Sequence, residues 1–361
     1  MNLKTTKDFK NIILKDLPLI DVRAPIEFEK GAFKNAINLP IMNNKERELV
    51  GIRYKNNGNE AATKLGYELV SDNVKKQRVD VWVKFIEQNP NAIIYCFRGG
   101  QRSQIAQKWI KERALEISRI DGGYKAFRNY LIDTLDNANN LFTPLRVAGK
   151  TGSGKTTILK EFKNFIDLEN LANHRGSAFG GFITPQPTQI NFENNLAYDV
   201  IKKAQFFNTI LFEDESRHIG KNYIPNRFFN YLSSSKIVLL EVDINTRVEN
   251  IFNDYIINEI TNYQNFYKEN GYKIWQEKML LDFMHIQKKL GFRRYQQILD
   301  IFNRAKDNLE IHKEWIELLL VQYYDPMYDY QLSNKQNSII FKGNKQEVLE
   351  YLNSKHFVLN T

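Results

Sequence analysis

The sequence has one cysteine among 361 residues and no long apolar run. A single cysteine excludes an internal disulfide and any metal site built from a cysteine cluster. No stretch of about 18 apolar residues is present to serve as a transmembrane helix. Residues 1–18 carry charges where a secretory signal has an uninterrupted apolar segment. We therefore expect a cytoplasmic protein with no membrane partner.

Low complexity and repeats are lacking as well. Hydrophobic residues make up 42% of the chain and charged residues 26%, which is the composition of a globular protein rather than of a disordered or collagen-like one. At roughly 100 to 200 residues per domain, the length predicts two or three domains.

Positive charge is unevenly distributed along the chain. The net charge is +9, and residues 1–140 contain 24 basic and 17 acidic residues, against 27 and 25 in the remainder. Such an excess is compatible with a polyanionic partner such as RNA, and equally with a lysine-rich solvated surface. Charge alone leaves both interpretations open.

The first part of the chain alternates short apolar runs with helical patterns. Residues 17–23 and 92–96 indicate buried strands, and a glycine-containing loop follows the second. Residues 103–115 then have apolar side chains at helical spacing, with Ser103 as the expected N-cap. A Gly-Gly turn and a helix at 120–135 complete this part.

A second alternation begins after a linker rich in Asn and Asp. Apolar strands are expected at the start of 145–162, at 208–213 and at 236–243, which favours a parallel sheet flanked by helices. From about residue 246 the pattern is amphipathic and helical. Residues 338–352 are expected to add a strand and a helix.

The lone cysteine opens the segment CFRGGQRS at 96–103, where a strand ends and a helix starts. In such a turn backbone N–H groups converge on the sulfur, and the helix dipole and two arginines favour its anion. Cys96 is therefore a candidate nucleophile. The residues expected to stabilise its thiolate are Arg98, Gly99, Gly100 and Arg102. The alternative is a buried structural cysteine, with the arginines packed against Asp21 or Asp121.

Four further segments carry a resemblance to a known fold. They are DVR at 21–23, GA at 31–32, INLP at 37–40 and GGY at 122–124. With the cysteine loop they resemble the rhodanese domain, over about residues 8–135. The resemblance implies that Cys96 carries a chalcogen or attacks one.

The cysteine loop departs from the usual rhodanese pattern in its length. Arg102 follows Cys96 by six positions, which makes the loop one residue longer than the sulfur-carrying form. Rhodanese-like phosphatases have a loop of this length, and it accommodates a tetrahedral anion. The departure leaves a phosphatase open and also suggests a phosphate-like co-substrate.

A phosphate-binding motif begins the second half. Residues 149–156, GKTGSGKT, match the P-loop pattern between a strand and a helix. Backbone amides of such a loop face the phosphates, Lys155 reaches a terminal phosphate oxygen, and Thr156 can hold Mg²⁺. The expected phosphate-binding residues are Gly149, Gly152, Ser153, Gly154, Lys155, Thr156 and Thr157.

The motif does not define the ligand of this loop. An NTPase needs an acidic residue after the second apolar strand, where the sequence has Glu213, Asp214 and Glu215. These carboxylates can serve a metal, although the first is Glu rather than Asp. A diphosphate ester would need the loop and the metal but no hydrolytic water.

We therefore predict an α/β fold in three parts. An N-terminal rhodanese-like domain with a parallel sheet is expected at 1–138, and a P-loop NTPase-like α/β domain at 139–250. A helical C-terminal extension at 251–361, including the tail, completes the P-loop half.

Further blocks extend the resemblance to nearly the whole chain. They are LENLANHRGSAFG at 168–180, QPTQ at 186–189, FE at 192–193, EDESR at 213–217, IG at 219–220, YYDPMY at 323–328 and APIEFE at 24–29. With the two loops, these blocks closely resemble the tRNA 2-selenouridine synthase family.

The resemblance implies a transferase that acts on tRNA. The family replaces sulfur by selenium at C2 of 5-substituted 2-thiouridine in the wobble position. Geranyl diphosphate first alkylates the sulfur, and selenium from selenophosphate then displaces the geranylthio group. The implied co-substrates are geranyl diphosphate and selenophosphate, with Mg²⁺ at Thr156 and no tightly bound cofactor. The implied partners are a tRNA with 2-thiouridine at the wobble position and an enzyme that supplies selenophosphate.

In this scheme the P-loop would bind the prenyl diphosphate and Cys96 would act in selenation. The residues implied to bind selenophosphate or to stabilise the thiolate are Arg98, Gly99, Gly100 and Arg102. Candidates for contacts to the diphosphate or the base are His174, Arg175, Glu213, Glu215 and Arg217. The alternatives are a structural loop pair for His174 and Arg175, and salt bridges to Arg217 for the two glutamates. Asp325, before Pro326, is expected to cap a turn.

Three other functions are compatible with the sequence. A rhodanese-type sulfurtransferase fused to an NTP-dependent kinase or ATPase acting on RNA would use the complete P-loop motif. A phosphatase would use Cys96 and Arg102. An RNA-binding adaptor without catalytic activity would use neither the cysteine loop nor the P-loop.

Overall fold

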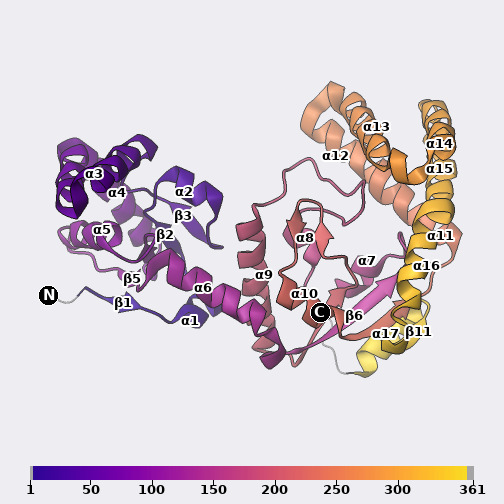
Figure 1. The fold of residues 1–361 in the computed structure, drawn as a ribbon, viewed down its shortest axis with the longest axis horizontal. Helices are drawn as coiled ribbons and strands as arrows, with labels where there is room; N and C mark the ends of the chain where they lie inside the picture. Colours follow the sequence, from indigo (N-terminus) through magenta and orange to yellow (C-terminus); the bar gives the residue numbers. More distant parts are fainter. Residues whose placement is uncertain (1–2, 356–361) are drawn as a thin grey trace. The chain divides into compact units, whose positions relative to one another are not determined.

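The computed structural model describes residues 3–355. The chain forms two compact units: residues 1–137 with 187–205, and residues 138–186 with 206–361 (Figure 1). The outermost residues of the predicted first and third domains, 1–2 and 356–361, lie outside the described part.

A five-stranded parallel sheet is the centre of the first unit. Its strands are β1 (Thr5–Thr6), β2 (Leu19–Asp21), β3 (Ala36–Asn38), β4 (Ile93–Tyr95) and β5 (Ser118–Ile120), in the order β1-β5-β4-β2-β3. Strands β2 and β4 are buried throughout, because helices cover both faces of the sheet. The carboxyl end of β4, where Cys96 follows, is therefore at the middle of the unit.

Seven helices of the described chain surround this sheet. They are α1 (Phe9–Leu14), α2 (Pro25–Lys30), α3 (Asn44–Leu69), α4 (Asp72–Gln88), α5 (Gln101–Lys111), α6 (Gly123–Asp136) and α9 (Gln189–Ala204). A capping box of Asn43 and Glu46 starts α3, and Gly58, with φ of 79°, breaks its helical path. Trp82 of α4 and Trp109 of α5 pack with the apolar residues of β2 and β4 in one core.

Helix α9 belongs to the first unit although it follows the P-loop in the sequence. It packs on α6 and α1. Asn194 accepts a hydrogen bond from Arg128 at 2.8 Å, and Asn191 accepts one from the backbone of Ala32 at 2.8 Å. The sequence-based boundaries placed this helix in the P-loop domain, since amphipathic spacing does not tell which core a helix joins.

The second unit has a four-stranded parallel sheet. Its strands are β6 (Thr143–Gly149), β7 (Thr209–Glu213), β10 (Lys236–Leu240) and β11 (Ile339–Gly343), in the order β11-β10-β6-β7, with a separate hairpin of β8 (His218–Ile219) and β9 (Asn222–Tyr223). The P-loop leaves the sheet from the inner strand β6. The predicted strand and helix of the tail are both present, as β11 and α17 (Lys345–Ser354).

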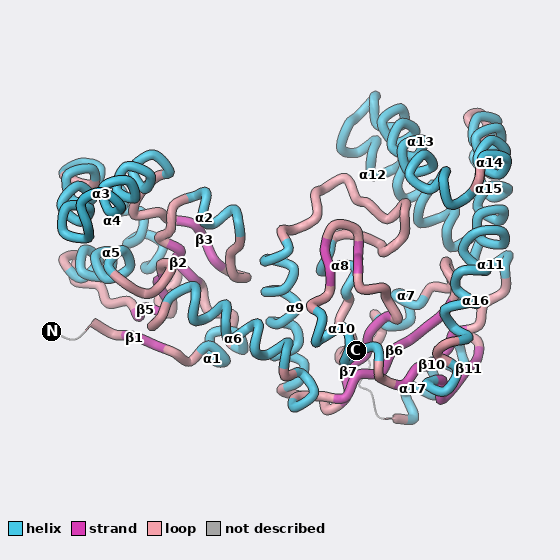
Figure 2. Tube along the Cα trace, in the orientation of Figure 1, coloured by secondary structure: helices cyan, strands magenta, loops and turns pink. Residues whose placement is uncertain are grey.

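Helices make up most of the rest of this unit (Figure 2). They are the α-helices α7 (Lys155–Leu159), α8 (Leu168–Ala172), α10 (Asn226–Ser233), α11 (Ile244–Ile251), α12 (Asn258–Tyr267), α13 (Gly271–Leu290), α14 (Phe292–Arg304), α15 (His312–Leu319) and α16 (Asp325–Ser333), the π-helices η2 (Phe252–Ile257) and η5 (Leu320–Tyr324), and the short 3₁₀ turns η1 (Ala138–Asn140), η3 (Lys268–Asn270), η4 (Leu309–Ile311) and η6 (Gln336–Ser338). Trp275, Phe283, Phe302 and Trp315 form the aromatic centre of the helical part.

The predicted α/β fold with a helical C-terminal region is confirmed. Across residues 3–355, no helix combines the length and apolarity that crossing a bilayer demands.

Candidate functional site

The thiol loop, residues 96–103, joins the carboxyl end of β4 to helix α5. Cys96 is only 3% exposed and packs on one side against the core cluster of the first unit. On its other side, Sγ lies 3.1 Å from the Ser103 hydroxyl and 3.8 Å from the Gly100 carbonyl oxygen. Ser103 was predicted to cap α5, but Gly100 occupies the N-cap position and Ser103 faces the sulfur instead.

Two glycines let the loop pack tightly against the start of α6. Gly99 has a φ of 64°, and a Cβ on it would lie 2.7 Å from the carbonyl oxygen of Ile120. Gly123 has a φ of 60°, and a Cβ on it would overlap the backbone of Gly99. The backbone N–H of Tyr124 donates to the Cys96 carbonyl at 2.8 Å, so the GGY segment and the cysteine loop form one structure.

The backbone N–H groups of residues 98–103 have no protein acceptor within the described part of the chain. They sit at the N-terminus of α5, where the helix dipole adds positive potential. Unpaired N–H donors in this position form a cradle for an anion. The loop therefore has the donors to bind a thiolate, a selenide or a phosphoryl oxygen, and its role stays a prediction.

The two arginines of the loop differ in their surroundings. Arg102 forms a double hydrogen bond with Glu27, at 2.6 and 3.2 Å. Burial of the Glu27 carboxyl opposes its ionisation, but the hydrogen bonds and charge of Arg102 outweigh this and lower the pKa of Glu27. Arg98 is exposed, and no carboxylate among residues 3–355 pairs with it.

The alternative partners expected for these arginines are wrong. Asp21 is fully buried and pairs with Arg23, at 2.6 Å, and Asp121 pairs with Lys7 at 3.2 Å. Residue spacing identified the arginines but not Glu27, which reaches the loop from another helix.

The phosphate loop, residues 149–157, opens onto a cavity of about 880 Å³. Every predicted phosphate-binding residue lines it: Gly149, Gly152, Ser153, Gly154, Lys155, Thr156 and Thr157. Lys155 donates to the Gly149 carbonyl at 2.9 Å, which holds its ammonium group over the loop. The Ser153 hydroxyl and the Tyr324 hydroxyl are buried without a partner in the described structure. An anion in the cavity would provide acceptors for such groups.

Helix α11 fixes the shape of this loop. Arg247 donates from Nε to the Thr151 carbonyl at 2.9 Å, and Asn250 donates to the Gly152 carbonyl at 2.9 Å. Arg247 also forms a bidentate pair with Asp325, at 2.9 and 2.6 Å. The prediction that Asp325 caps a turn is wrong, because η5 continues into α16 through this residue.

Three glutamates cluster beside the phosphate loop. Glu213, at the end of β7, is 1% exposed and accepts a hydrogen bond from the Thr156 hydroxyl, while its Oε2 has no partner among the described residues. Glu169 and Glu215 both line the cavity on either side of Gly176, where a Cβ would lie 3.0 and 2.7 Å from their oxygens. The sequence did not predict a role for Glu169, since only folding brings it to the other two.

Burial suppresses the ionisation of these three glutamates to different degrees. Burial and the charge of Glu215 raise the pKa of Glu169 to about 8. Burial raises the pKa of Glu215 to about 6, although Lys155 opposes this shift. Burial and Glu169 also raise the pKa of Glu213 well above its ordinary value. The cluster therefore holds protons near neutral pH and repels an anionic ligand less than three carboxylates would.

The other predicted site residues, His174, Arg175 and Arg217, have different surroundings in the structure. Arg175 lines the cavity, pairs with Glu259 at 2.9 Å and lies over the ring of Tyr255. His174 accepts a hydrogen bond from the Gly176 N–H at 3.2 Å, and burial lowers its pKa. Arg217 lies over the ring of Tyr223.

The observed contacts of these residues can be compared with the structural alternatives stated for them. His174 stabilises its own loop, as the structural alternative stated, whereas Arg175 also faces the cavity. Neither Glu213 nor Glu215 forms a salt bridge with Arg217 within residues 3–355.

A magnesium ion fits the surroundings of Thr156. The described residues contain no cluster of three or more His, Cys, Asp or Glu side chains suited to a metal. However, Mg²⁺ is usually held by one or two protein ligands together with phosphate oxygens and water. Thr156 and the unpartnered oxygen of Glu213 supply such a pair once Glu213 has lost its proton, which the charge of a bound cation favours.

Comparison with known proteins covers both units. The family model of the tRNA 2-selenouridine synthase AAA domain matches residues 142–358, and that of the rhodanese-like domain matches residues 5–130. A tRNA 2-selenouridine synthase of Sulfurovum sp. (strain NBC37-1) is 49% identical over 97% of this chain and 98% of its own.

Other relatives give the same result. Proteins of the same name from Hydrogenovibrio crunogenus and Shewanella frigidimarina are 46% and 43% identical, over 96% and 97% of this chain and 98% of each relative. A solved structure, the N-terminal domain of a putative ATP/GTP binding protein from Clostridium difficile 630, covers 32% of this chain and 89% of its own at 33% identity, with a TM-score of 0.30. The matches to these relatives run along nearly the full length of this chain and of each relative.

Proposed function

The chain belongs to the tRNA 2-selenouridine synthase family, and we propose that it exchanges sulfur for selenium in a tRNA through two reactions served by its two loops. The observation that carries the proposal is the presence, in one chain, of an anion cradle around a thiol and a P-loop beside a cavity. The substrate is a tRNA with a 5-substituted 2-thiouridine at the wobble position. Because this substrate is a cytoplasmic polyanion, the basic excess of residues 1–140 is assigned to contact with it.

The first reaction is geranylation, assigned to the phosphate loop. The C2 sulfur of the nucleobase attacks C1 of geranyl diphosphate, and the C1–O bond breaks with its electron pair remaining on the diphosphate. The N3 proton of the base is released to solvent. Lys155 and the loop amides neutralise the diphosphate as it leaves.

Thr156 and Glu213 are the residues that would hold Mg²⁺, which would neutralise further charge on the diphosphate. The protonated state of Glu169 removes a negative charge from the same cavity at neutral pH. Arg175 also lines this cavity, with its charge paired to Glu259.

The second reaction is selenation, assigned to the thiol loop. Alkylation turns the sulfur into a good leaving group at C2. The Cys96 thiolate adds to C2, and the geranylthio group departs and takes up a proton. The selenium of selenophosphate then attacks C2 and releases the Cys96 thiolate, and water cleaves the Se–P bond to give phosphate.

This role for Cys96 needs no oxidant. A cysteine perselenide, by contrast, contains selenium two electrons above the oxidation state in selenophosphate, so a carrier role would need an oxidising co-reactant. The chain has no second thiol to resolve such an adduct. Arg98 and the N–H groups of the loop bind the phosphoryl oxygens of the donor in this scheme.

Nucleoside mass spectrometry tests the division of labour. Thiolated tRNA is incubated with geranyl diphosphate and selenophosphate, using the wild type, Cys96→Ala, Lys155→Ala and the exposed control Lys160→Ala. We expect Cys96→Ala to accumulate geranylated uridine without selenouridine, and Lys155→Ala to form neither product. Lys160→Ala should match the wild type, because its ammonium group lies outside the cavity lining.

The reverse pattern would overturn the assignment of the loops. Absence of both products with the wild type would overturn the function. ATP hydrolysis stimulated by tRNA, without geranylation, would instead support a sulfurtransferase joined to an ATPase.

A further inference from the structure

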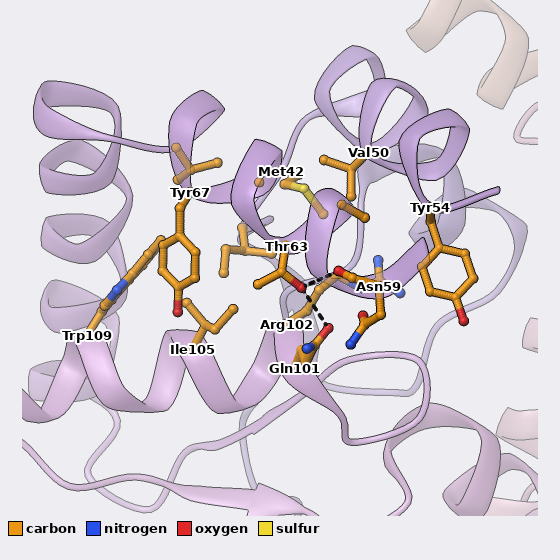
Figure 3. A pocket seen from close by; sticks show the side chains of 14 residues that line it. Met42, Val50, Tyr54, Asn59, Thr63, Tyr67, Gln101, Arg102, Ile105 and Trp109 are labelled. Atoms are coloured by element: carbon orange, nitrogen blue, oxygen red, sulfur yellow. Dashed lines mark hydrogen bonds between the residues drawn. The ribbon is translucent and has the colours of Figure 1, made fainter. Parts of the chain in front are cut away.

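An apolar pocket of about 180 Å³ lies between α3 and α5 of the first unit (Figure 3). Met42, Val50, Ile105 and Trp109 provide much of its wall. A cavity of roughly 150 Å³ with an apolar lining holds a benzene molecule. The pocket is therefore large enough for one end of a branched hydrocarbon chain, and it is open to solvent at its rim, where the rest of such a chain can lie.

The pocket and the thiol share the first turn of α5. Gln101 and Arg102 line the pocket, while Ser103, the next residue, contacts the sulfur of Cys96 at 3.1 Å. Met42 and Trp109, which line the pocket, also belong to the core cluster that contains Cys96. The pocket and the thiol therefore adjoin the same end of α5.

Polarity changes from one end of the pocket to the other. In Figure 3, Trp109, Tyr67 and Ile105 lie at one end, and the polar side chains of Asn59 and Gln101 lie with Tyr54 and Val50 toward the other. Thr63 stands between them and its hydroxyl donates to the Asn59 carbonyl at 2.8 Å. Tyr54 is 59% exposed, so its ring is open to a stacking partner at the polar end.

We propose that this pocket binds the prenyl chain of the geranylated nucleoside during selenation, an inference that rests on the function proposed above. The geranylated nucleoside has an uncharged branched hydrocarbon tail joined to a planar polar base. The pocket offers apolar side chains at one end for the tail and polar groups toward the other end for the base. The chain enters between Ile105 and Trp109, the base lies toward Gln101 and Tyr54, and C2 faces the thiol loop. Selenation is thereby restricted to alkylated uridine, because an unmodified 2-thiouridine does not fill the apolar end.

The test varies the S-alkyl group of the substrate. RNA oligonucleotides that contain S-geranyl-2-thiouridine or S-methyl-2-thiouridine are given to the wild type with selenophosphate, and the KM and kcat of selenation are measured. Both groups leave as alkylthiolates, so the chemistry at C2 is the same. The pocket predicts a KM about tenfold lower for the geranyl substrate with a similar kcat.

A pocket-filling variant provides the matched comparison. Thr63→Trp fills the centre of the pocket, and Lys64→Trp adds the same side chain at the exposed neighbouring position of α3. Thr63→Trp should raise the KM for the geranyl substrate to that of the methyl substrate and leave the methyl KM unchanged. Lys64→Trp should behave as the wild type, and both should geranylate tRNA at the wild-type rate.

The outcomes separate the two claims. Equal KM values for the two substrates with the wild type overturn the pocket assignment, even if Thr63→Trp does not fold. Equal effects of Thr63→Trp on both substrates overturn it as well. A wild type that selenates neither oligonucleotide overturns the proposed function and this inference with it.

Discussion

The thiol loop of the first unit and the phosphate loop of the second have the same construction and opposite electrostatic surroundings. Each follows an inner strand of a parallel sheet and leads into a helix N-terminus. Beside the thiol loop, Glu27 is kept ionised by Arg102, so its pKa is lowered. Beside the phosphate loop, burial keeps Glu169 protonated, with a pKa raised to about 8.

This difference has a consequence for the chemistry of each loop. The thiol loop has one arginine engaged by a carboxylate and one exposed, so its positive charge is already partly balanced. The phosphate loop faces carboxylates that do not ionise fully near neutral pH, so its cavity can accept a multiply charged ligand. In the proposed function, the same backbone motif serves a nucleophile in one unit and a diphosphate in the other.

The largest effect is expected where the thiol loop meets α6. Gly123→Ala places a methyl group against the backbone of Gly99, at a φ that alanine rarely adopts. A misplacement of about 1 Å in such a site costs about 100-fold in rate. Nucleoside analysis should show selenation reduced by at least that factor, with geranylation retained. Gly51→Ala is the control, because a Cβ at that position meets open space. An equal loss of geranylation and selenation in Gly123→Ala would mean that the two loops are not independent.

The next effect is expected from the clamp on the phosphate loop. Arg247→Ala removes the support of the Thr151 carbonyl and leaves Asp325 with Lys150, at 3.5 Å, as its ion-pair partner. Breaking a buried ion pair costs about 3 kcal/mol. Calorimetry should show a loss of stability of the second unit up to that size, and geranylation should fall while selenation of pre-geranylated tRNA continues. Unchanged geranylation would show that the loop keeps its shape without the clamp.

A pH-dependent effect is expected for Glu169. Its pKa is higher in the folded state than the ordinary value, so the folded protein binds more protons between pH 4.5 and about 8. The stabilising contribution of the protonated Glu169 side chain to folding is therefore fully present at low pH. It is lost as the pH rises through about 8. Glu169→Gln should be more stable than the wild type at pH 9, by on the order of 2 kcal/mol, and should show no such loss. If the stability of Glu169→Gln and of the wild type changed with pH in parallel, the raised pKa of Glu169 would be contradicted.

A smaller effect of opposite sign is expected for Glu27. Its pKa is lowered in the folded state, so its stabilising contribution is present above the ordinary pKa of 4.5 and is lost as the pH falls. Glu27→Gln should cost about 1 kcal/mol at pH 7, since the pair with Arg102 is partly exposed, and the difference from wild type should disappear toward pH 3. A difference that grows toward acid pH would contradict the assignment.

The sequence predicted the parts of both sites that are local. The P-loop residues, the position of Cys96 after a strand, and the strand and helix of the tail all follow from short patterns, and the structure contains each of them. Patterns of this kind depend on backbone conformation over a few residues, which the local sequence determines.

Residues that reach a site from elsewhere were not predictable in this way. Glu27 and Arg247 lie far along the chain from the loops they support, Glu169 reaches its loop from a separate helix, and no motif spacing connects any of them to the loops. The assignment of α9 to the first unit has the same origin, because its apolar face fits either core by pattern alone. The N-cap of α5 was misplaced because a serine before an amphipathic run is a good cap, while its hydroxyl contacts the thiol instead.

The central claim is that the two loops perform separate reactions in sequence. It is tested most directly by giving pre-geranylated tRNA and selenophosphate to Lys155→Ala and Cys96→Ala and measuring selenouridine by mass spectrometry. The account predicts that Lys155→Ala forms selenouridine at the wild-type rate and that Cys96→Ala forms none. Selenouridine from Cys96→Ala, or none from a folded Lys155→Ala, would contradict it.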